Sequence, residues 1–449
     1  MSETQKIPPG WIKASVKDIS ISIQYGYTES STTENIGPKF LRITDIQDNN
    51  VYWQNVPYCK ISEAETEKYL LHDGDLVFAR TGATVGKSFL IKGSIPKAIF
   101  ASYLIRLRFP EQIFDKYISY YFQSPFYWNE IINKQVGTGQ PNVNGTILGI
   151  LQFPLSPIPE QHRIVAKIEE LFSSLDKGVE SLKTAQAQLK TYRQAVLKWA
   201  FEGKLTNVNV KEGELPEGWK LKLVKEISSV LGDGLHGTPI YSDDGEYYFI
   251  NGNNLSDGKI EIKENTKQVS FDEFKKYKKT LNDRTILVSI NGTLGNTAFY
   301  NNEKVILGKS ACYFNVLENV DKKYIRYCIT SHRFINYANK TATGSTIKNV
   351  GLKAMREFEI PLPSTLAEQH RIVSEIETRL SVCDKLEESI TQSLVQAEAL
   401  RQSILKKAFA GKLVPQDSND EPAGVLLERI RTERAKRPKK KTRSTKVKK

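Results

Sequence analysis

The stretch that looks most like a chemical site runs from Thr81 to Ser88 and reads TGATVGKS, which ends like a phosphate-binding loop. That motif needs a glycine five residues before Gly86, but this position holds Thr81. A related stretch later in the chain, INGTLGN, has Asn296 where the lysine would stand. A tight turn between two strands therefore explains both stretches better than a nucleotide site.

The other residue types that could support catalysis lack the spacing that catalysis needs. The five histidines show no metal-ligand spacing, and the four cysteines are scattered with no CxxC pair. The chain has no Asn/Asp-Pro-Pro-aromatic motif for amino-group methylation, no obvious glycine-rich loop for a methyl donor, and no Pro-Asp dipeptide to open a nuclease site. Nothing indicates a Ser-His-Asp arrangement. We therefore predict a binding protein with no catalytic residue and no metal site.

The elements that would position a binding surface are duplicated. Residues 160–205 and 368–413 align without a gap, about half of the positions are identical, and His162 and His370 are 208 residues apart. The same offset relates the Gly-Trp pairs at 10–11 and 218–219. Matched fragments between these anchors are Gly82 to Gly86 with Gly292 to Gly295, and Thr138-Gly139 with Asn144 against Thr343-Gly344 with Asn349. So many ordered matches establish an internal repeat.

Each repeat ends in a segment with the heptad pattern of a coiled coil. In the first copy the two apolar rows are Ile168, Leu175, Leu182, Leu189 and Val196, and Ile164, Leu171, Gly178, Ala185, Tyr192 and Trp199. The second copy keeps the pattern in Ile372, Ile376, Leu386, Ile390, Ala397, Leu400 and Ile404. A helix of this length is roughly 60 Å long. We expect the two helices to pack antiparallel with pseudo-twofold symmetry; the alternative is a core helix of an ordinary domain.

The globular modules contain short β-like runs, such as DLVFAR, FLRITDI, YYFING and TILVSI, and helical stretches such as FDKYISYYFQS. We predict an α+β chain with two mixed α/β modules in tandem, each followed by a long helix. The expected segments are 1–158 and 215–364 for the modules, 159–205 and 365–413 for the helices, 206–214 for the linker, and 414–449 for a C-terminal extension with a basic, disordered tail.

The positive net charge of the chain comes mostly from its C-terminal end. The net charge is +13, but residues 434–449 hold ten basic and no acidic residues, so the first 433 carry about +3. The tail could contact nucleic acid without sequence preference or simply favour solubility, and both alternatives stay open. The scattered cysteines, the absence of 18 consecutive apolar residues and the lack of a signal-peptide core lead us to expect a cytoplasmic protein.

The whole pattern resembles the specificity subunits of type I restriction–modification enzymes. Each module closes with a Thr-Gly…Asn…Leu…Pro passage, followed by Glu-Gln-His-Arg-Ile-Val and a helix that ends in AFxGKL. These passages run from Thr138 to Val165 and from Thr343 to Val373, and the resemblance covers nearly all of the chain up to about Ala435. Gly145 stands where we align Val350, which predicts a slightly different turn there.

The resemblance implies a non-catalytic subunit that reads a bipartite double-stranded DNA site, one half-site per module. It also implies two adenine methyltransferase subunits that bind S-adenosylmethionine, and two restriction subunits that use ATP and Mg²⁺. No cofactor is implied for this chain itself. A self-sufficient methyltransferase or nuclease with unrecognised motifs, and a coiled-coil adaptor that binds only proteins, remain the alternative functions.

Comparing the two copies sorts the candidate residues. Modules that read different half-sites must differ at base-reading positions, whereas shared residues should serve the scaffold or a partner subunit. The candidates for DNA contact are Arg80, Lys87, Lys134, Gln135, Gln140, Asn142, Asn291, Asn296, Lys309, Ser345, Thr346 and Lys348. The candidates for scaffold or partner binding are Glu160, Gln161, His162, Arg163, Glu368, Gln369, His370 and Arg371. For any single DNA-contact candidate, a solvated surface or turn position is the alternative.

Overall fold

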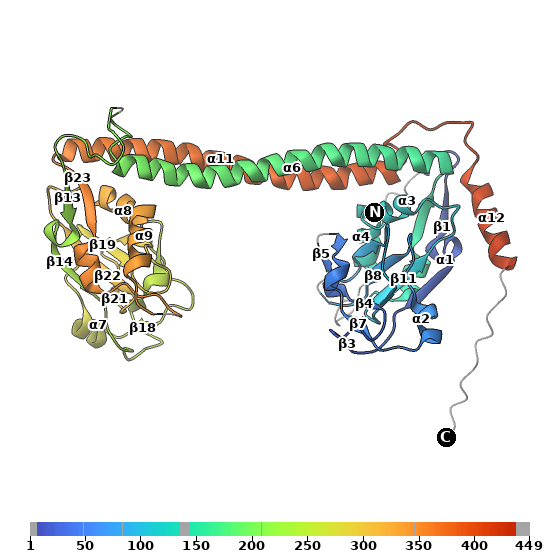
Figure 1. Cartoon of the computed structure of the whole chain (residues 1–449), viewed down its shortest axis with the longest axis horizontal. Helices are drawn as coiled ribbons and strands as arrows, with labels where there is room; N and C mark the ends of the chain where they lie inside the picture. Colours follow the sequence, from blue (N-terminus) through green and yellow to red (C-terminus); the bar gives the residue numbers. More distant parts are fainter. Residues whose placement is uncertain are drawn as a thin grey trace, which may run out of the picture. The chain divides into compact units, whose positions relative to one another are not determined.

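A computed structural model describes residues 7–436 of this chain except 48, 83, 135–142, 208 and 345. The chain divides into two compact units, one formed by residues up to Ser181 together with those from Ser393 onward, the other by Leu182 to Gln392. Each unit contains one globular module and parts of both long helices, α6 (Ile158–Phe201) and α11 (Leu366–Phe409) (Figure 1). The predicted arrangement of mixed modules in tandem with long helices is confirmed.

The first module contains two four-stranded sheets. One is antiparallel with the order β2-β11-β8-β9, and the other has the order β10-β4-β7-β3, in which β10 and β4 run parallel. Strand β1 pairs with β12 and so joins the two ends of the module. The strands are β1 Ile12–Ser15, β2 Ser22–Tyr25, β3 Ser31–Thr32, β4 Lys39–Leu41, β5 Ile46–Gln47, β6 Asn50–Val51, β7 Tyr58–Cys59, β8 Leu76–Ala79, β9 Ser88–Leu90, β10 Ala98–Phe100, β11 Leu104–Arg108 and β12 Gln152–Leu155. Its helices are α1 Val16–Ile19, α2 Glu63–Tyr69, α3 Asp115–Tyr121, α4 Pro125–Lys134 and α5 Gly145–Ile150, with short 3-10 turns η1 Ile43–Asp45 and η2 Trp53–Asn55.

The second module repeats this plan. Its antiparallel sheet has the order β14-β22-β19-β20, its second sheet the order β18-β15-β21, and β13 pairs with β23. The strands are β13 Trp219–Leu223, β14 Ser228–Asp233, β15 Tyr247–Ile250, β16 Leu255–Ser256, β17 Lys259–Ile260, β18 Gln268–Val269, β19 Thr285–Ser289, β20 Thr297–Phe299, β21 Val305–Leu307, β22 Ala311–Val316 and β23 Glu359–Pro363. Its helices are α7 Phe271–Tyr277, α8 Lys322–Thr330, α9 His332–Thr341 and α10 Leu352–Glu357, with 3-10 turns η3 Val224–Glu226 and η4 Gly252–Asn254.

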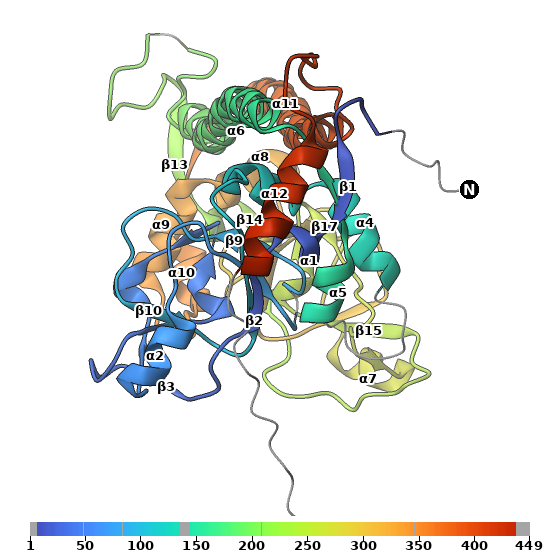
Figure 2. The ribbon, with the colours of Figure 1, turned by 90° about the vertical axis from the view of Figure 1, so that its right-hand side faces the viewer.

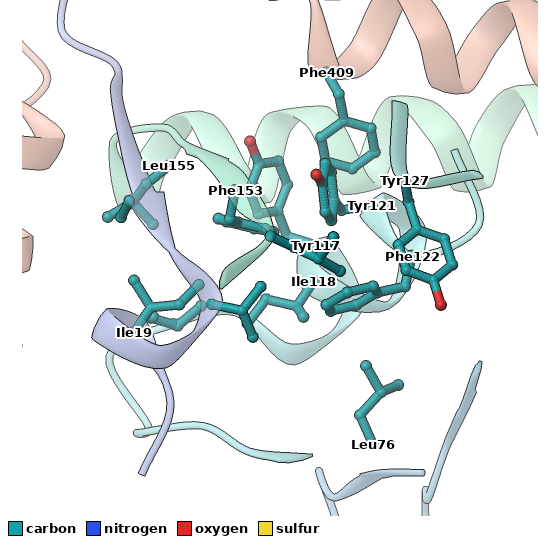
Figure 3. Packing of buried hydrophobic residues seen from close by; sticks show 14 of the residues in the cluster. Ile19, Leu76, Tyr117, Ile118, Tyr121, Phe122, Tyr127, Phe153, Leu155 and Phe409 are labelled. Atoms are coloured by element: carbon teal, nitrogen blue, oxygen red, sulfur yellow. The ribbon is translucent and has the colours of Figure 1, made fainter. Parts of the chain in front are cut away.

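The core of the first unit explains how a module is fixed to its helix. Tyr117 and Tyr121 of α3 lie among Phe153 of β12 and Phe409 of α11, with ring centroids 4.8–5.7 Å apart (Figure 3). Their buried hydroxyls donate to the carbonyl oxygens of Pro154 (3.0 Å) and Gln152 (2.7 Å), so no phenol is left unsatisfied. This fixes α3 against the strand that immediately precedes α6.

Within each unit, α6 and α11 run antiparallel. In the first unit Arg401 pairs with Asp176 and lies over the Phe172 ring at 4.3 Å. In the second unit Arg193 donates to Asp384 at 2.6 Å. Because 193 and 401, and likewise 176 and 384, are 208 residues apart, these two ion pairs are one contact made twice. The two units therefore repeat the same helix–helix contact with equivalent residues.

One of the predicted apolar rows departs from a strict seven-residue repeat. The first row is buried or half-buried throughout, from Ile168 to Val196, but Gly178, Tyr192 and Trp199 of the second row are exposed. Their neighbours Val179, Arg193 and Ala200 take the inward positions. In α11, Leu386 and Leu400 are about half exposed, while Cys383 is buried. A straight helix has 3.6 residues per turn, so its buried stripe drifts past a seven-residue repeat.

The C-terminal extension is more ordered than its composition predicted. Ala423–Lys436 form helix α12, and Ala423, Leu426, Leu427 and Ile430 join the core of the first unit. The helix lies against α1 and β1 (Figure 2), and the Arg434 guanidinium donates to the carbonyl oxygen of Lys17 at 2.5 Å. The prediction of a disordered tail was therefore wrong for Arg434 to Lys436. Residues 437–449 lie outside the described residues.

Two further expectations bear on the environment of the chain. Among the described residues, no helix is both long and apolar enough to cross a membrane. All four cysteines are free and buried. Burial raises the pKa of the Cys328 thiol to about 12, so this thiol stays protonated and unreactive at neutral pH.

Candidate nucleic-acid interface

Both modules bring three loops together at one end of the antiparallel sheet. In the first module the Arg80 N–H donates to the Tyr103 carbonyl oxygen at 2.9 Å, and the Val143 N–H donates to the Arg80 carbonyl oxygen at 3.1 Å. In the second module the Ile290 N–H donates to the Ser310 carbonyl oxygen at 3.0 Å, and the Val350 N–H donates to the Ile290 carbonyl oxygen at 2.8 Å. The chain therefore builds the same three-loop frame twice, which we call the strand-end surface.

This frame corrects the alignment of the two copies. Val143 and Val350 occupy equivalent positions, so Gly145 corresponds to Leu352 rather than to Val350. Asn144 is the N-cap of α5, and its side chain accepts the Ile147 N–H, whereas the N-cap of α10 is Gly351. The sequence match of Asn144 with Asn349 was therefore wrong by two residues. It rested on a short stretch of similar sequence, whereas the backbone hydrogen bonds pair Asn144 with Gly351.

In the first module an arginine and two tyrosines occupy the strand-end surface. The Arg80 guanidinium lies 5.2 Å from the centroid of the Tyr25 ring, and the Tyr25 hydroxyl accepts the Gly145 N–H at 2.9 Å. The Tyr103 side chain is 63% exposed. Among the described residues nothing bonds the buried Arg80 Nε, and a buried polar group of this kind is costly unless a partner satisfies it. Arginine on an aromatic face, beside an exposed ring, suits contact with bases.

In the second module the equivalent surface is built from amides and a lysine. The Asn291 side chain donates to the Asn349 side chain at 3.4 Å, and the Gly292 N–H donates to the Lys348 carbonyl oxygen at 3.0 Å. The Lys348 ammonium donates to the Asn339 side chain at 2.6 Å. Thr346 and Ile347 beside them are exposed. Asn291, Thr346 and Lys348 therefore lie together at the end of β19.

Three further candidates lie in loops between strands, two in the β8–β9 and β19–β20 hairpins and Lys309 between β21 and β22. The Lys87 and Asn296 carbonyl oxygens accept the equivalent N–H groups of Ala79 and Ser289, at 2.9 and 2.8 Å, where the chain returns into β9 or β20. The Lys87 side chain is exposed. Lys309 is also exposed, and its N–H donates to the Leu235 carbonyl oxygen at 3.0 Å. The turn predicted in place of a phosphate loop is confirmed, since β8 and β9 pair directly across it.

Five candidates cannot be placed. Gln135, Gln140, Asn142, Ser345 and the side chain of Lys134 lie outside the described residues. Sequence reasoning also missed exposed apolar residues of the surface loops, because it searched polar types only. They are Tyr25, Ile36 and Tyr103 in the first module and Ile240, Tyr241 and Ile347 in the second. A signal was available for Tyr25, an aromatic residue directly before Gly26, whereas nothing local marks Tyr103.

The shared Glu-Gln pairs hold each module to its own helix. The Trp11 indole N–H donates to Glu160 at 2.8 Å, and Trp219 donates to Glu368 at 3.3 Å. Burial raises the pKa of Glu160, although the Trp11 bond opposes the shift. The side-chain carbonyls of Gln161 and Gln369 accept the N–H groups of Phe114 and Asp321, at 3.2 and 2.8 Å.

The His-Arg pairs that follow lie nearer the surface. The His162 ring packs at a tilt against Phe114 with ring centroids 4.3 Å apart, and His370 contacts Asp321 at 3.1 Å. Arg163 pairs with Asp420 of the C-terminal extension at 2.6 Å, whereas Arg371 is exposed and lies 3.7 Å from Glu368. Among the described residues no group of three or more His, Cys, Asp or Glu side chains could hold a metal ion.

Comparison with known proteins agrees with this duplicated architecture. The family model described as "Type I restriction modification DNA specificity domain" matches residues 8–190 and again 216–396. The StySPI specificity subunit of Salmonella potsdam is 25% identical over 96% of both chains. The EcoKI specificity subunit of Escherichia coli K12 is 25% identical over 96% of this chain and 97% of its own. In fold, the chain is similar to the HsdS subunit from Thermoanaerobacter tengcongensis, with a TM-score of 0.58, 20% identity, and coverage of 91% of this chain and 99% of that one.

Proposed function

The chain belongs to the family of type I restriction–modification DNA specificity domains, and we propose that it reads a bipartite DNA site with one half-site per module. The observation that carries this proposal is the strand-end surface, whose backbone frame is shared while its side chains differ. Arg80 stands where the second module has Ile290, Tyr103 where it has Ser310, and Lys87 where it has Asn296. A common frame with different contact residues is what two readers of different sequences need.

Partner subunits would supply the chemistry. We propose two methyltransferase subunits that bind S-adenosylmethionine and two restriction subunits that use ATP and Mg²⁺, each binding near a repeated part of this chain. The duplicated Glu-Gln-His-Arg segments support such pairing, because His162 and His370 are both exposed at equivalent positions. The cytoplasmic compartment expected from the sequence stays a prediction.

The decisive experiment maps methylated adenines across the genome of cells that carry the methyltransferase with or without this chain. A bipartite motif that disappears when the chain is removed is the expected result. If the purified chain alone methylates DNA with S-adenosylmethionine, it is a self-sufficient enzyme and the proposal fails. If the complex retains no DNA sequence selectively from a random pool, the chain is a protein-binding adaptor.

A further inference from the structure

The second unit contains a pocket of about 570 Å³ between α6 and the start of α9. Its apolar floor is formed by Ala195, Leu197 and Phe201 of α6, and the Phe201 ring is fixed from behind by Tyr324, with centroids 5.2 Å apart. Lys190 and Lys198 border it on α6, and His332 and Arg333 border it on α9. One carboxylate, Glu202, also lines it and pairs with Lys198 at 3.7 Å and Lys204 at 2.9 Å.

The start of α9 adds hydrogen-bond donors to this pocket. Its N-cap, Ser331, does not cap the helix with its side chain, because the hydroxyl donates instead to the Cys328 carbonyl oxygen at 2.6 Å. The first N–H groups of a helix need acceptors and carry partial positive charge. Together with the bordering lysine and arginine side chains, they favour a carboxylate beside the apolar floor.

The first copy has an aromatic residue at the equivalent place on its helix α4. Ser124 and Ser331 are equivalent, because the backbone carbonyl oxygen of each accepts the N–H of the residue four positions later. These donors are Trp128 and Ile335, both at 3.2 Å. Pro125 and Phe126 therefore stand where the second copy has His332 and Arg333. Proline at the first helical position has no N–H that needs an acceptor, and Phe126 packs against the core that contains Leu405 and Phe409. Arg333 instead turns its guanidinium to the Glu359 carbonyl oxygen at 3.2 Å.

We propose that the pocket of the second unit binds an acidic segment of a partner subunit through an aromatic side chain. The aromatic ring would take the place that Phe126 takes in the first copy, and a neighbouring carboxylate would accept from the α9 N-terminus and face Lys190. A nucleic-acid phosphate fits less well, because the floor is apolar. The basic C-terminal tail of this chain has the wrong charge. The inference rests on the proposed function for the identity of the partner, a methyltransferase subunit.

The sharpest test replaces His332 and Arg333 with the proline and phenylalanine that the first copy has at these positions. The double variant His332→Pro/Arg333→Phe should fold at least as well as the wild type, because proline suits the first helical position and phenylalanine fills the pocket. Titrating the methyltransferase subunit onto each full-length chain should show one of two binding steps weakened by tenfold or more. Lys190→Glu, an exposed change that leaves the pocket open, should weaken the same step less.

A peptide probe identifies the chemistry directly. The peptide acetyl-Asp-Glu-Phe-Asp-Glu-amide should bind the wild-type chain in calorimetry, whereas its Phe→Ala form and a Lys-flanked Phe peptide should bind at least tenfold more weakly. Unchanged methyltransferase binding by a well-folded double variant would overturn the inference. Preference for the Lys-flanked peptide, or competition by a DNA duplex for the acidic one, would overturn it equally. Failure of the methyltransferase to bind even the wild type would refute the proposed function instead.

Discussion

A half-chain that ends after α6, in the linker near Asn207, should form a symmetric dimer. In the full chain, the core of the first module is completed by Ile404, Leu405, Ala408 and Phe409 of α11. Their equivalents 208 residues earlier are Val196, Leu197, Ala200 and Phe201, which complete the second module in the same way. A half-chain holds one module and one such helix end, so two copies can complete each other.

The stability of this dimer can be estimated from the Phe201 side chain. It is 3% exposed and packs on Tyr324 at 5.2 Å, just as Phe409 packs on Tyr117 at 5.1 Å. In the half-chain dimer Phe201 of each copy would pack on Tyr117 of the other. Phe→Ala costs about 3–5 kcal/mol per site, and the dimer contains two sites. Phe201→Ala should therefore raise the dimer dissociation constant more than 10⁴-fold, at ~1.4 kcal/mol per decade.

A charge swap tests the register of the helices. Asp176 and Arg193 of opposite copies would form two ion pairs, equivalent to Arg401–Asp176 and Arg193–Asp384 in the full chain. The carboxylates are more than 60% exposed, so each pair contributes about 0.2–1 kcal/mol. Asp176→Arg should weaken the dimer by about 2- to 30-fold. Asp176→Arg/Arg193→Asp should restore it, while Lys190→Glu, outside the pair, should have little effect.

Sedimentation equilibrium over a range of concentrations measures these constants, and adenine mapping shows whether the half-chain directs methylation to a symmetric site. A stable monomeric half-chain would refute the paired-helix account. If the half-chain dimerises but Asp176→Arg/Arg193→Asp does not restore its affinity, only the antiparallel register of the two helices is refuted.

Three further predictions concern separate parts of the chain. Arg80→Ala should relax the methylated motif at one position of the first half-site only, by about 1–3 kcal/mol of base discrimination, as measured by adenine mapping; a change in the second half-site would contradict this. Truncation after Lys436 removes eight basic residues and should reduce the slope of log K against log salt by up to about 7 for specific and random duplexes alike. An unchanged slope would show that the tail does not contact DNA. Glu160→Gln should raise the melting temperature at neutral pH: burial raises the folded-state pKa of Glu160, so its stabilising contribution is present at low pH and is lost as pH rises through that pKa. The gain should vanish in acid, and a gain that grows as pH falls would contradict the reasoning.

The duplicated plan was accessible from sequence because it rests on repeated local patterns. Identical residues at a constant offset predicted the tandem modules, and apolar periodicity predicted α6 and α11. The Tyr25–Arg80 contact was not accessible, because it depends on β2 and β8 both flanking β11, a long-range pairing with no local signal. The strict heptad failed for Gly178 and Tyr192 because these helices follow their own 3.6-residue period.

Helix α12 was missed although its pattern is complete. Ala423, Leu426, Leu427 and Ile430 are spaced as one apolar face, and Pro422 precedes them at the start of the helix. The count of basic residues in the tail obscured this face. Composition describes a segment on average, whereas four well-spaced apolar residues are enough to attach it to a core.

The two modules also differ at the surface that α12 contacts, and this difference explains why α12 packs on the first module. Ile21 lines the contact with Ile430, and Ile12 of β1 packs against the same core. Their equivalents in the second module, Ser229 and Lys220, are polar and exposed, so α12 would gain little apolar burial there.

Transferring these residues should release the helix. Ile21→Ser/Ile12→Lys should increase amide hydrogen exchange in α12, from Leu426 to Ile430, toward that of an isolated 14-residue helix, which is marginal in water. Exposed Lys13→Leu, which transfers the second-copy residue Leu221, is the matched control and should leave this exchange unchanged. Full protection of α12 in the double variant would show that Arg163–Asp420 and Arg434–Lys17 hold the helix without the apolar face.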